Sequence, residues 1–269
     1  MAKRRLDVYL FEKGYFDSRE KAKAAVLAGE VFIDGIRVTK AGTPVADSVS
    51  VTVKQRENIY VGRGGLKLKR ALDFFEIDVQ NKVFLDIGAS TGGFTDCLLR
   101  SGARKVWAID VGYGQLDYKL RTDERVTVLE KTNFRHLQFE AVGERADGFV
   151  MDVSFISVLK LTENLKQFLK DGAEGIILIK PQFEGARALV EKHGIVKKPS
   201  VHIDILNGVV TALYDSGYSV EGLTYSGIKG AKGNIEFLLY IKHNMLLKKQ
   251  LDTFEVKRVV EEAHTELSV

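Results

Sequence analysis

Four ionisable side chains stand where an open α/β sheet places its catalytic groups. Asp152 and Lys180 each close a run of apolar, strand-like residues. Glu236 begins the last such run. Lys67 lies near the beginning of an expected basic helix, which precedes the first strand-like run. Because ligands bind such sheets at the carboxyl ends of the strands, Asp152 and Lys180 should face a ligand. Lysines and carboxylates there can transfer a proton or stabilise a developing anion.

The alternative for each of these side chains alone is a charge that faces solvent at the end of a strand. For Lys180 this alternative is weaker, because four apolar residues precede it and Pro181 fixes the exit of the chain.

A glycine-rich segment follows the first of the strand-like runs. It reads Asp86, Ile87, Gly88, Ala89, Ser90, Thr91, Gly92, Gly93, Phe94. Glycine at this point lets the backbone approach a ligand closely. The glycines do not have the GxGxxG spacing of a pyrophosphate-binding turn, which disfavours a dehydrogenase. The looser form suits a ligand with an amino-acid tail and no phosphate, and we expect Asp86 and residues 88–94 to bind it.

Further contacts to the same ligand are expected from neighbouring strand ends. Asp86 can act on the ammonium group of the ligand, directly or through water. Asp110 closes the second strand, where a carboxylate can accept both hydroxyls of a ribose. Asp152 is expected to contact the ligand too, and Asn133 to approach an adenine base. The five histidines show no metal-ligand spacing, so no metal site is expected.

The elements that must position these residues alternate between strand-like and helical patterns from residue 82 onward. Seven strands are expected, at 83–87, 106–110, 126–129, 148–151, 175–179, 219–225 and 236–241. Helices are expected notably at 93–100, 155–170, 201–216 and 246–267. This alternation predicts an α/β fold with a doubly wound, Rossmann-like parallel sheet.

The last two strands should break the parallel pattern. Only ten residues separate Tyr225 from Glu236, whereas a crossover between parallel strands needs a dozen or more. The final pair is therefore expected to be an antiparallel hairpin. A sheet of seven strands with the last one antiparallel is typical of S-adenosylmethionine-dependent methyltransferases.

The N-terminal segment predicts a separate small α+β fold. A short amphipathic helix is expected over 4–13, and Ser18 is a good N-cap for a second helix that Gly29 stops. Residues 31–38 predict a hairpin around Asp34-Gly35, and alternation over 48–53 predicts a strand. So short a segment has a marginal core of its own.

Charge is distributed unevenly along the chain. Residues 1–72 carry 15 Lys and Arg against 8 Asp and Glu, whereas the remainder carries 25 against 28. A basic end on a near-neutral body indicates a polyanionic partner reached through that end. The alternative is a basic surface that serves only solubility.

The N-terminal segment resembles the S4-like RNA-binding domain. The matching residues are Arg5-Leu6-Asp7, Leu10, Ser18-Arg19, Ala22, Gly29-Glu30-Val31 and Ile33-Asp34-Gly35. The resemblance implies RNA contacts from the second helix and its flanks, here Arg4, Arg5, Arg19, Lys21 and Lys23. Contacts to phosphates provide affinity and register rather than base identity. For any one of these residues alone, a solvated charge is the alternative.

Nearly the whole chain resembles the hemolysin A, or TlyA-type, family of rRNA 2′-O-methyltransferases, which join an S4-like domain to an FtsJ-like methyltransferase domain. The matching strings are Gly64-Gly65-Leu66-Lys67-Leu68, residues 86–94, residues 110–116, residues 152–157, residues 180–184 and Gly233-Asn234-Ile235-Glu236-Phe237. We therefore expect an S4-like domain over 1–58, a linker over 59–65 and a methyltransferase domain over 66–269. The family usually has Ser-Pro-Ile where this chain has Ser226-Gly227-Ile228, a departure that involves no expected catalytic position.

The resemblance implies a Lys-Asp-Lys-Glu tetrad, which falls on Lys67, Asp152, Lys180 and Glu236, with S-adenosylmethionine as cofactor. A ribose hydroxyl is a poor nucleophile and must lose or share its proton as it attacks the sulfonium methyl. We assign stabilisation of the developing alkoxide, or removal of its proton, to Lys180, with Asp152 and Glu236 holding the two lysines. The implied substrate is a cytidine 2′-hydroxyl in bacterial ribosomal RNA. The expected partners are ribosomal RNA and ribosomal subunits, and no obligate protein partner is expected.

Two alternatives come from other functional classes. A membrane-lytic protein would need a membrane-active segment, but no apolar run approaches the roughly 20 residues of a span and the N-terminus lacks the apolar core of a signal peptide. The single cysteine, Cys97, fits a reducing compartment, and we expect a cytoplasmic protein that does not enter a membrane. An RNA-binding module without catalysis is the second alternative, and the four polar residues argue against it.

Overall fold

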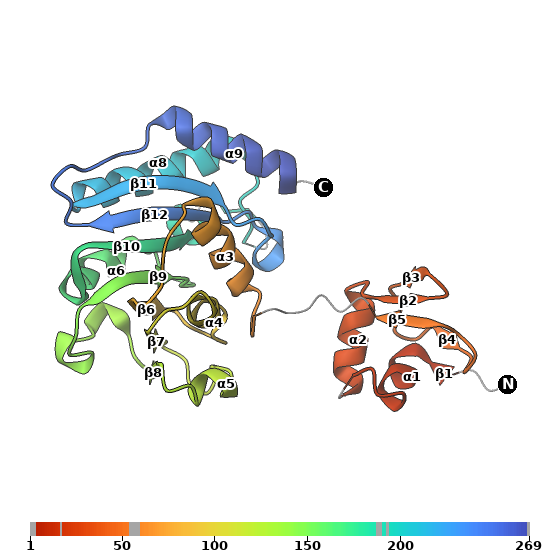
Figure 1. Ribbon diagram of the computed structural model, residues 1–269. Helices are drawn as coiled ribbons and strands as arrows, with labels where there is room; N and C mark the ends of the chain where they lie inside the picture. The colour runs from red at the N-terminus through yellow and green to blue at the C-terminus, as the bar shows by residue number, and fades with distance from the viewer. Residues whose placement is uncertain (1–3, 17, 54–59, 187–189, 192–193, 268–269) are drawn as a thin grey trace. The chain divides into compact units, whose positions relative to one another are not determined.

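The computed structural model describes residues 4–16, 18–53, 60–186, 190–191 and 194–267. The chain divides into two compact units, Met1–Ile59 and Tyr60–Val269 (Figure 1). The expected boundary at 58–59 lies outside the described residues. Residues 60–65, expected as a linker, lie in the second unit, where Tyr60 is buried and the Val61 N–H donates to Asp96 Oδ2 at 2.9 Å.

The N-terminal unit consists of two helices and short strands. The helices are α1 (Leu6–Glu12) and α2 (Arg19–Leu27). The strands are β1 (Arg4–Arg5), β2 (Val31–Ile33), β3 (Ile36–Val38), β4 (Pro44–Val45) and β5 (Val51–Val53). They form a β3-β2-β5 sheet and a separate β1-β4 pair.

Local chemistry explains why these elements begin and end where they do. The Ser18 hydroxyl accepts the Lys21 N–H at 3.2 Å, so the predicted N-cap of α2 is confirmed. Asp34 and Gly35 have φ values of 48° and 81°, the conformation of a type I′ turn, and the predicted hairpin is confirmed. The expected first helix begins two residues later than predicted, because Arg4 and Arg5 pair with β4.

A seven-stranded sheet forms the centre of the second unit, in the order β11-β12-β10-β9-β6-β7-β8 (Figure 1). The strands are β6 (Val83–Ile87), β7 (Lys105–Ile109), β8 (Val126–Leu129), β9 (Ala146–Met151), β10 (Leu169–Ile179), β11 (Tyr218–Tyr225) and β12 (Phe237–His243). Five neighbouring strands, β10 to β8 in that order, are parallel, and β12 lies antiparallel between β10 and β11. The predicted Rossmann-like sheet with its reversed last strand is confirmed.

Helices cover both faces of this sheet. They are α3 (Gly64–Phe74), α4 (Gly93–Arg100), α5 (Tyr118–Arg121), α6 (Leu159–Leu165), α7 (Pro181–Glu184), α8 (Pro199–Asp215) and α9 (Thr253–Leu267), with 3₁₀ turns at Phe134–His136, Phe139–Ala141, Lys166–Phe168 and Ala231–Gly233. One apolar core packs α6, α8 and α9 against the sheet, and a second packs α3 and α4 against the opposite face. Alternate residues of β6 enter each core: Leu85 joins the first and Phe84 the second.

Two expected helices begin later than predicted. The helix expected over 155–170 begins at Leu159, because Phe155 has a φ of 65° and the Val158 N–H donates to the Glu184 carboxylate at 3.0 Å. The helix expected over 246–267 begins at Thr253. There, Asp252 accepts the Glu255 N–H at 2.8 Å and Glu255 accepts the Asp252 N–H at 3.2 Å, which is a capping box.

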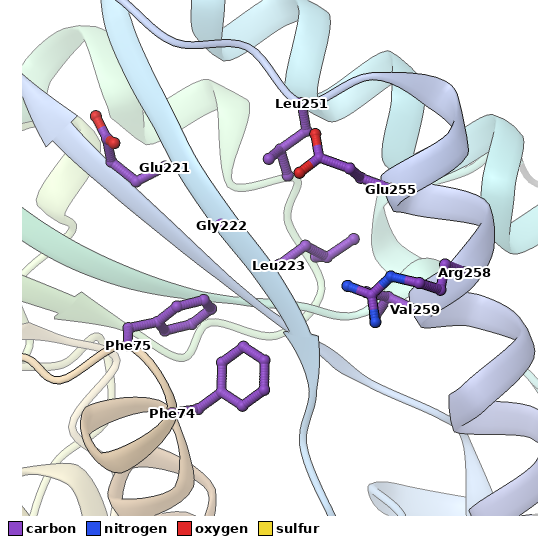
Figure 2. A pocket seen from close by; sticks show the side chains of 9 residues that line it. All are labelled: Phe74, Phe75, Glu221, Gly222, Leu223, Leu251, Glu255, Arg258 and Val259. Atoms are coloured by element: carbon purple, nitrogen blue, oxygen red, sulfur yellow. The ribbon is translucent and has the colours of Figure 1, made fainter.

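The end of α3 is anchored near the edge of the sheet. Figure 2 shows Phe74 of α3 and the next residue, Phe75, beside Leu223 of β11, with Arg258 of α9 across a pocket of about 220 Å³. The Phe75 ring also lies 5.3 Å from the ring of Tyr240 on β12. This packing fixes α3 against β11 and β12, and no expected site residue lines the pocket. Its relevance to the site is that α3 carries Lys67.

Candidate active site

Lys67 and Glu236 form a buried ion pair between α3 and the start of β12. Lys67 Nζ lies 2.5 Å from Glu236 Oε2, and the two side chains are 10% and 2% exposed. A pair so far removed from water must have good geometry, since each charge alone would be costly to bury.

Lys180 and Asp152 form a second ion pair at the ends of the neighbouring parallel strands β10 and β9. Lys180 Nζ lies 2.6 Å from Asp152 Oδ1 and donates to the Ser154 hydroxyl at 2.9 Å. Because Ile177 pairs with Met151 in the sheet, both strands end at the same edge. The ammonium group therefore has a counter-charge in Asp152 and a hydrogen-bond acceptor in Ser154.

Strand register brings the two ion pairs to one place. Ile179 of β10 pairs with Phe237 of β12, so the next residues along, Lys180 and Glu236, lie opposite each other. Gly64, the first residue of α3, lies near Asp152: a Cβ at Gly64 would be 3.9 Å from Asp152 Oδ2. The structure therefore gathers all four expected catalytic residues at the carboxyl edge of the sheet.

Two adjoining cavities open at this edge. The larger, of about 460 Å³, is lined mainly by apolar residues together with Asp110, Asn133 and Asp152. The smaller, of about 200 Å³, is lined by Gly64, Lys180, Asp152, Ser154 and residues 88–91, 93 and 94 of the glycine-rich segment. The two cavities share Gly88, Ser90, Asp152 and Ser154. Of the expected cofactor-binding residues, only Asp86 and Gly92 line neither cavity.

The glycine-rich segment needs a glycine where it leaves β6. Gly88 has a φ of 87°, and a Cβ there would lie 2.5 Å from the carbonyl oxygen of Asp152. Any side chain would therefore push the segment away from the loop that carries Asp152.

Asp110 ties two loops together at the larger cavity. Its Oδ2 accepts the Ser90 N–H at 2.8 Å, and its Oδ1 accepts the Gly112 N–H at 2.7 Å. Each carboxylate oxygen has a further lone pair, so Asp110 can still accept a hydrogen bond from a hydroxyl group of a ligand. Asn133 is similarly engaged, since its side chain accepts the Arg135 N–H at 3.1 Å and caps a 3₁₀ turn.

Asp86 is placed beneath the glycine-rich segment rather than in a cavity. Its side chain is fully buried and accepts the Thr95 hydroxyl at 2.6 Å through Oδ2, while Oδ1 has no hydrogen-bond partner in the described structure. Burial raises the pKa of Asp86 to about 7. In the described structure, Asp86 thus supports the segment from below.

Family models match both units of the chain. Residues 60–243 match the FtsJ-like methyltransferase family, and residues 4–50 match the S4 domain. The chain belongs to the FtsJ-like methyltransferase family. The family resemblance inferred from the motifs is confirmed.

Relatives extend along nearly the full length of the chain. The rRNA methyltransferase-like protein YqxC of Bacillus subtilis is 45% identical, over 98% of this chain and 95% of YqxC. The Mycobacterium tuberculosis 16S/23S rRNA (cytidine-2′-O)-methyltransferase TlyA is 41% identical, over 90% of this chain and 91% of TlyA. A solved hemolysin-like structure from Streptococcus thermophilus is 40% identical with a TM-score of 0.80, over all of this chain and 98% of that one.

The methyltransferase domain also exposes an aromatic side chain that the sequence patterns did not single out. Phe155 is 91% exposed, lines the larger cavity and has a φ of 65°, rare for a bulky residue. Its ring centroid lies 5.1 Å from that of Phe183. The sequence patterns place Phe155 inside the helix expected over 155–170. A phenylalanine in such a helix is expected to pack in the core, so its exposure was not predicted.

Glu184 is a second such residue. Its carboxylate accepts the Ser157 hydroxyl at 2.6 Å and the Val158 N–H at 3.0 Å, and burial raises the pKa of Glu184. It thereby joins the loop after β9, which carries Asp152, to the segment after β10, which begins with Lys180.

In the S4 domain, the expected RNA-binding residues are partly held by carboxylates. Arg5 and Arg19 donate to Asp7 at 3.0 and 3.1 Å, and Asp7 is 1% exposed. Hydrogen bonds from Arg5 in particular lower the pKa of Asp7. Arg4 pairs with Glu12 and Asp47, both at 2.7 Å. The remaining two, Lys21 and Lys23, are exposed on α2.

Other kinds of site receive no support from the described residues. Among them, no group of three or more His, Cys, Asp or Glu side chains could hold a metal ion. None of the described helices combines the length and the apolar character that crossing a membrane requires.

Proposed function

We propose that this chain transfers the methyl group of S-adenosylmethionine to the 2′-hydroxyl of a cytidine in bacterial ribosomal RNA. The observation that carries this proposal is the gathering of Lys67, Asp152, Lys180 and Glu236 beside the cavities of the glycine-rich segment. The choice of ribosomal RNA and cytidine as substrate follows the activity named for relatives such as TlyA.

The residues present fit S-adenosylmethionine. The larger cavity offers apolar walls for an adenine, the Asp110 carboxylate for ribose hydroxyls and the Asn133 side chain for a base edge. The smaller cavity is polar and bounded by the backbone of residues 88–91, which suits an amino-acid tail without phosphate. When bound, S-adenosylmethionine supplies an electrophilic methyl group.

Lys180 is the residue that we assign to the attacking hydroxyl. Its ammonium group pairs with Asp152 and donates to the Ser154 hydroxyl, and the side chain lines the smaller cavity. A fixed cation beside the 2′-oxygen stabilises the negative charge that develops there, and its preorganisation lowers the cost of reaching the transition state. Asp152 positions Lys180, and Glu236 neutralises and positions Lys67 beside them.

RNA binding is proposed for both units. In the S4 domain, Arg5 and Arg19 are preorganised by Asp7, and Lys21 and Lys23 add positive charge for phosphates. At the mouth of the larger cavity, the exposed ring of Phe155 provides a surface on which an unstacked base can lie. An enzyme with this substrate would act in the cytoplasm, where ribosomal subunits are present.

The reaction can be tested by mapping 2′-O-methyl groups on ribosomal RNA from cells that contain or lack this protein. We expect at least one cytidine to lose its 2′-O-methyl group in the absence of the protein and to regain it when the wild-type chain is restored. The purified chain should also transfer label from tritiated S-adenosylmethionine to ribosomal subunits isolated from the deficient cells. An identical methylation map with and without the protein would contradict the proposal.

A further inference from the structure

Two segments of the methyltransferase domain are fastened together by one buried amide. Asn234 lies in the loop between β11 and β12 and is 2% exposed. Its Oδ1 accepts the Val196 N–H at 3.0 Å, and its Nδ2 donates to the Gly194 carbonyl at 2.9 Å. The loop over 226–236 and the segment over 194–198 therefore form one surface, although they are far apart in the sequence.

The same loop is built against the Lys67–Glu236 pair. A Cβ at Gly230 would lie 1.9 Å from Glu236 Oε1, so the backbone of the loop rests directly on that carboxylate. Arg63, immediately before α3, donates to the Lys229 carbonyl at 2.9 Å. The position of the loop is thus linked to the helix that carries Lys67 and to the strand that follows Glu236.

These two segments carry three lysines, of which Lys198 and Lys232 are exposed and Lys229 is half-buried. We call Lys198, Lys229 and Lys232 the lysine face. None of the three forms an ion pair with any residue that the structure describes. The adjacent Lys197, in contrast, pairs with Glu191 at 3.0 Å. A Cβ at Gly194 would lie 3.9 Å from Lys232 Nζ, so this ammonium group is close to the segment over 194–198. A cation that has no counter-charge among the described residues can pair with an anionic ligand.

We propose that the lysine face binds the phosphate backbone of the RNA substrate beside the target ribose, as a contact separate from the S4 domain. A polyanion supplies the counter-charges that these lysines lack among the described residues, and it releases its own counterions on binding. Since the loop also rests on Glu236, a strand bound there lies next to the ion pairs of the active site. This inference rests on the proposed RNA substrate and adds the surface along which the RNA runs.

The test compares two full-length variants that each lose three positive charges. One carries Lys198→Gln, Lys229→Gln and Lys232→Gln; the control carries Lys166→Gln, Lys170→Gln and Lys257→Gln, at lysines already paired with carboxylates. Affinity for purified ribosomal subunits and for poly(U) RNA is measured over a range of salt concentrations. Affinity for S-adenosylmethionine, measured by calorimetry, reports whether each variant keeps a folded site.

For poly(U), we expect the dependence of log affinity on log salt to become shallower by about 2 in the lysine-face variant, since each lost single-strand phosphate contact contributes about 0.7. We expect the control to behave like the wild type and all three proteins to bind S-adenosylmethionine equally. A wild-type salt dependence in the lysine-face variant, on both RNAs, would overturn the inference. If the wild type bound RNA through the lysine face but methylated no ribosomal RNA, the proposed reaction would fail while the surface stood. If the wild type bound no RNA at all, both would be overturned.

Discussion

Lys67 Nζ and Glu236 Oε2 lie 2.5 Å apart, although 169 positions separate the two residues in the sequence. The contact joins the first helix of the methyltransferase domain to its last strand. The ion pair therefore depends on the packing of α3 beside the start of β12.

Removing Glu236 should destabilise the protein more than removing both partners. Glu236→Ala leaves Lys67 buried and uncompensated, and we expect the free energy of unfolding to fall by about 3–5 kcal/mol. The double variant Lys67→Met/Glu236→Leu should recover much of this loss, because an apolar pair needs no counter-charge. Both variants should transfer no methyl group. Chemical denaturation and a methyl-transfer assay measure the two effects, and normal transfer by the double variant would rule out a catalytic role for the pair.

Gly230→Ala should impair catalysis without weakening cofactor binding. The added Cβ would overlap Glu236 Oε1, which must then move away from Lys67. We expect a fall in kcat of at least tenfold, the factor that about 1.4 kcal/mol of transition-state stabilisation represents. Gly208→Ala is the matched control: Gly208 is exposed within α8 with no atom near its Cβ position, so this change should stabilise the helix by about 0.5–1 kcal/mol and leave kcat unchanged.

Asp86 should make stability depend on pH near neutrality. Burial raises the pKa of Asp86 to about 7, whereas the pKa of an aspartate carboxyl in an unfolded chain is roughly 3.9. Between these values the folded state holds a proton that the unfolded state releases, so the contribution of Asp86 falls as pH rises from about 4 to 7 and is constant above. Asp86→Asn removes this titration. The difference in unfolding free energy between wild type and variant should follow that course in denaturation series at several pH values, and a difference independent of pH would contradict it.

Phe155→Ala should weaken the use of RNA more than the binding of S-adenosylmethionine, because the ring is one of several apolar side chains that line the larger cavity. The ring is almost fully exposed, so its loss should cost little stability. Base–aromatic stacking contributes about 1–3 kcal/mol, and we expect KM for ribosomal subunits to rise by roughly 5- to 150-fold. Phe155→Tyr keeps a stacking surface and should restore most of the wild-type KM. An unchanged KM in Phe155→Ala would show that no base stacks there.

The sheet was predictable because its strands are short apolar runs with clear limits. The expected bounds of 83–87 and 126–129, and those of the helix over 93–100, are the observed ones. The late start of α9 was also visible in the sequence, since Asp252 and Glu255 have the spacing of a capping box. The expected helix began too early, at Leu246, since Leu246 and Leu247 are exposed and precede the capping box.

Strand ends predict part of the site, and the family resemblance supplies Lys67 and Glu236, but the contacts among these residues come only from the folded chain. Asp152 and Lys180 close neighbouring parallel strands, so their approach follows from the fold class. The partner of Lys67 depends on how α3 packs across β12, which no local pattern contains. Likewise, only the folded chain shows that Asp110 bonds the Ser90 and Gly112 amides, and that Asp86 lies beneath the glycine-rich segment.

A single-turnover experiment with Lys180→Ala tests the role of Lys180, with affinity for S-adenosylmethionine and methyl transfer to ribosomal subunits measured on the same protein. Lys180 lines only the smaller cavity, so the larger one should still bind the adenosine part of the cofactor. We predict binding of S-adenosylmethionine close to that of the wild type and no detectable transfer of the methyl group. Methyl transfer at the wild-type rate by Lys180→Ala would contradict the assignment of Lys180 to the attacking hydroxyl.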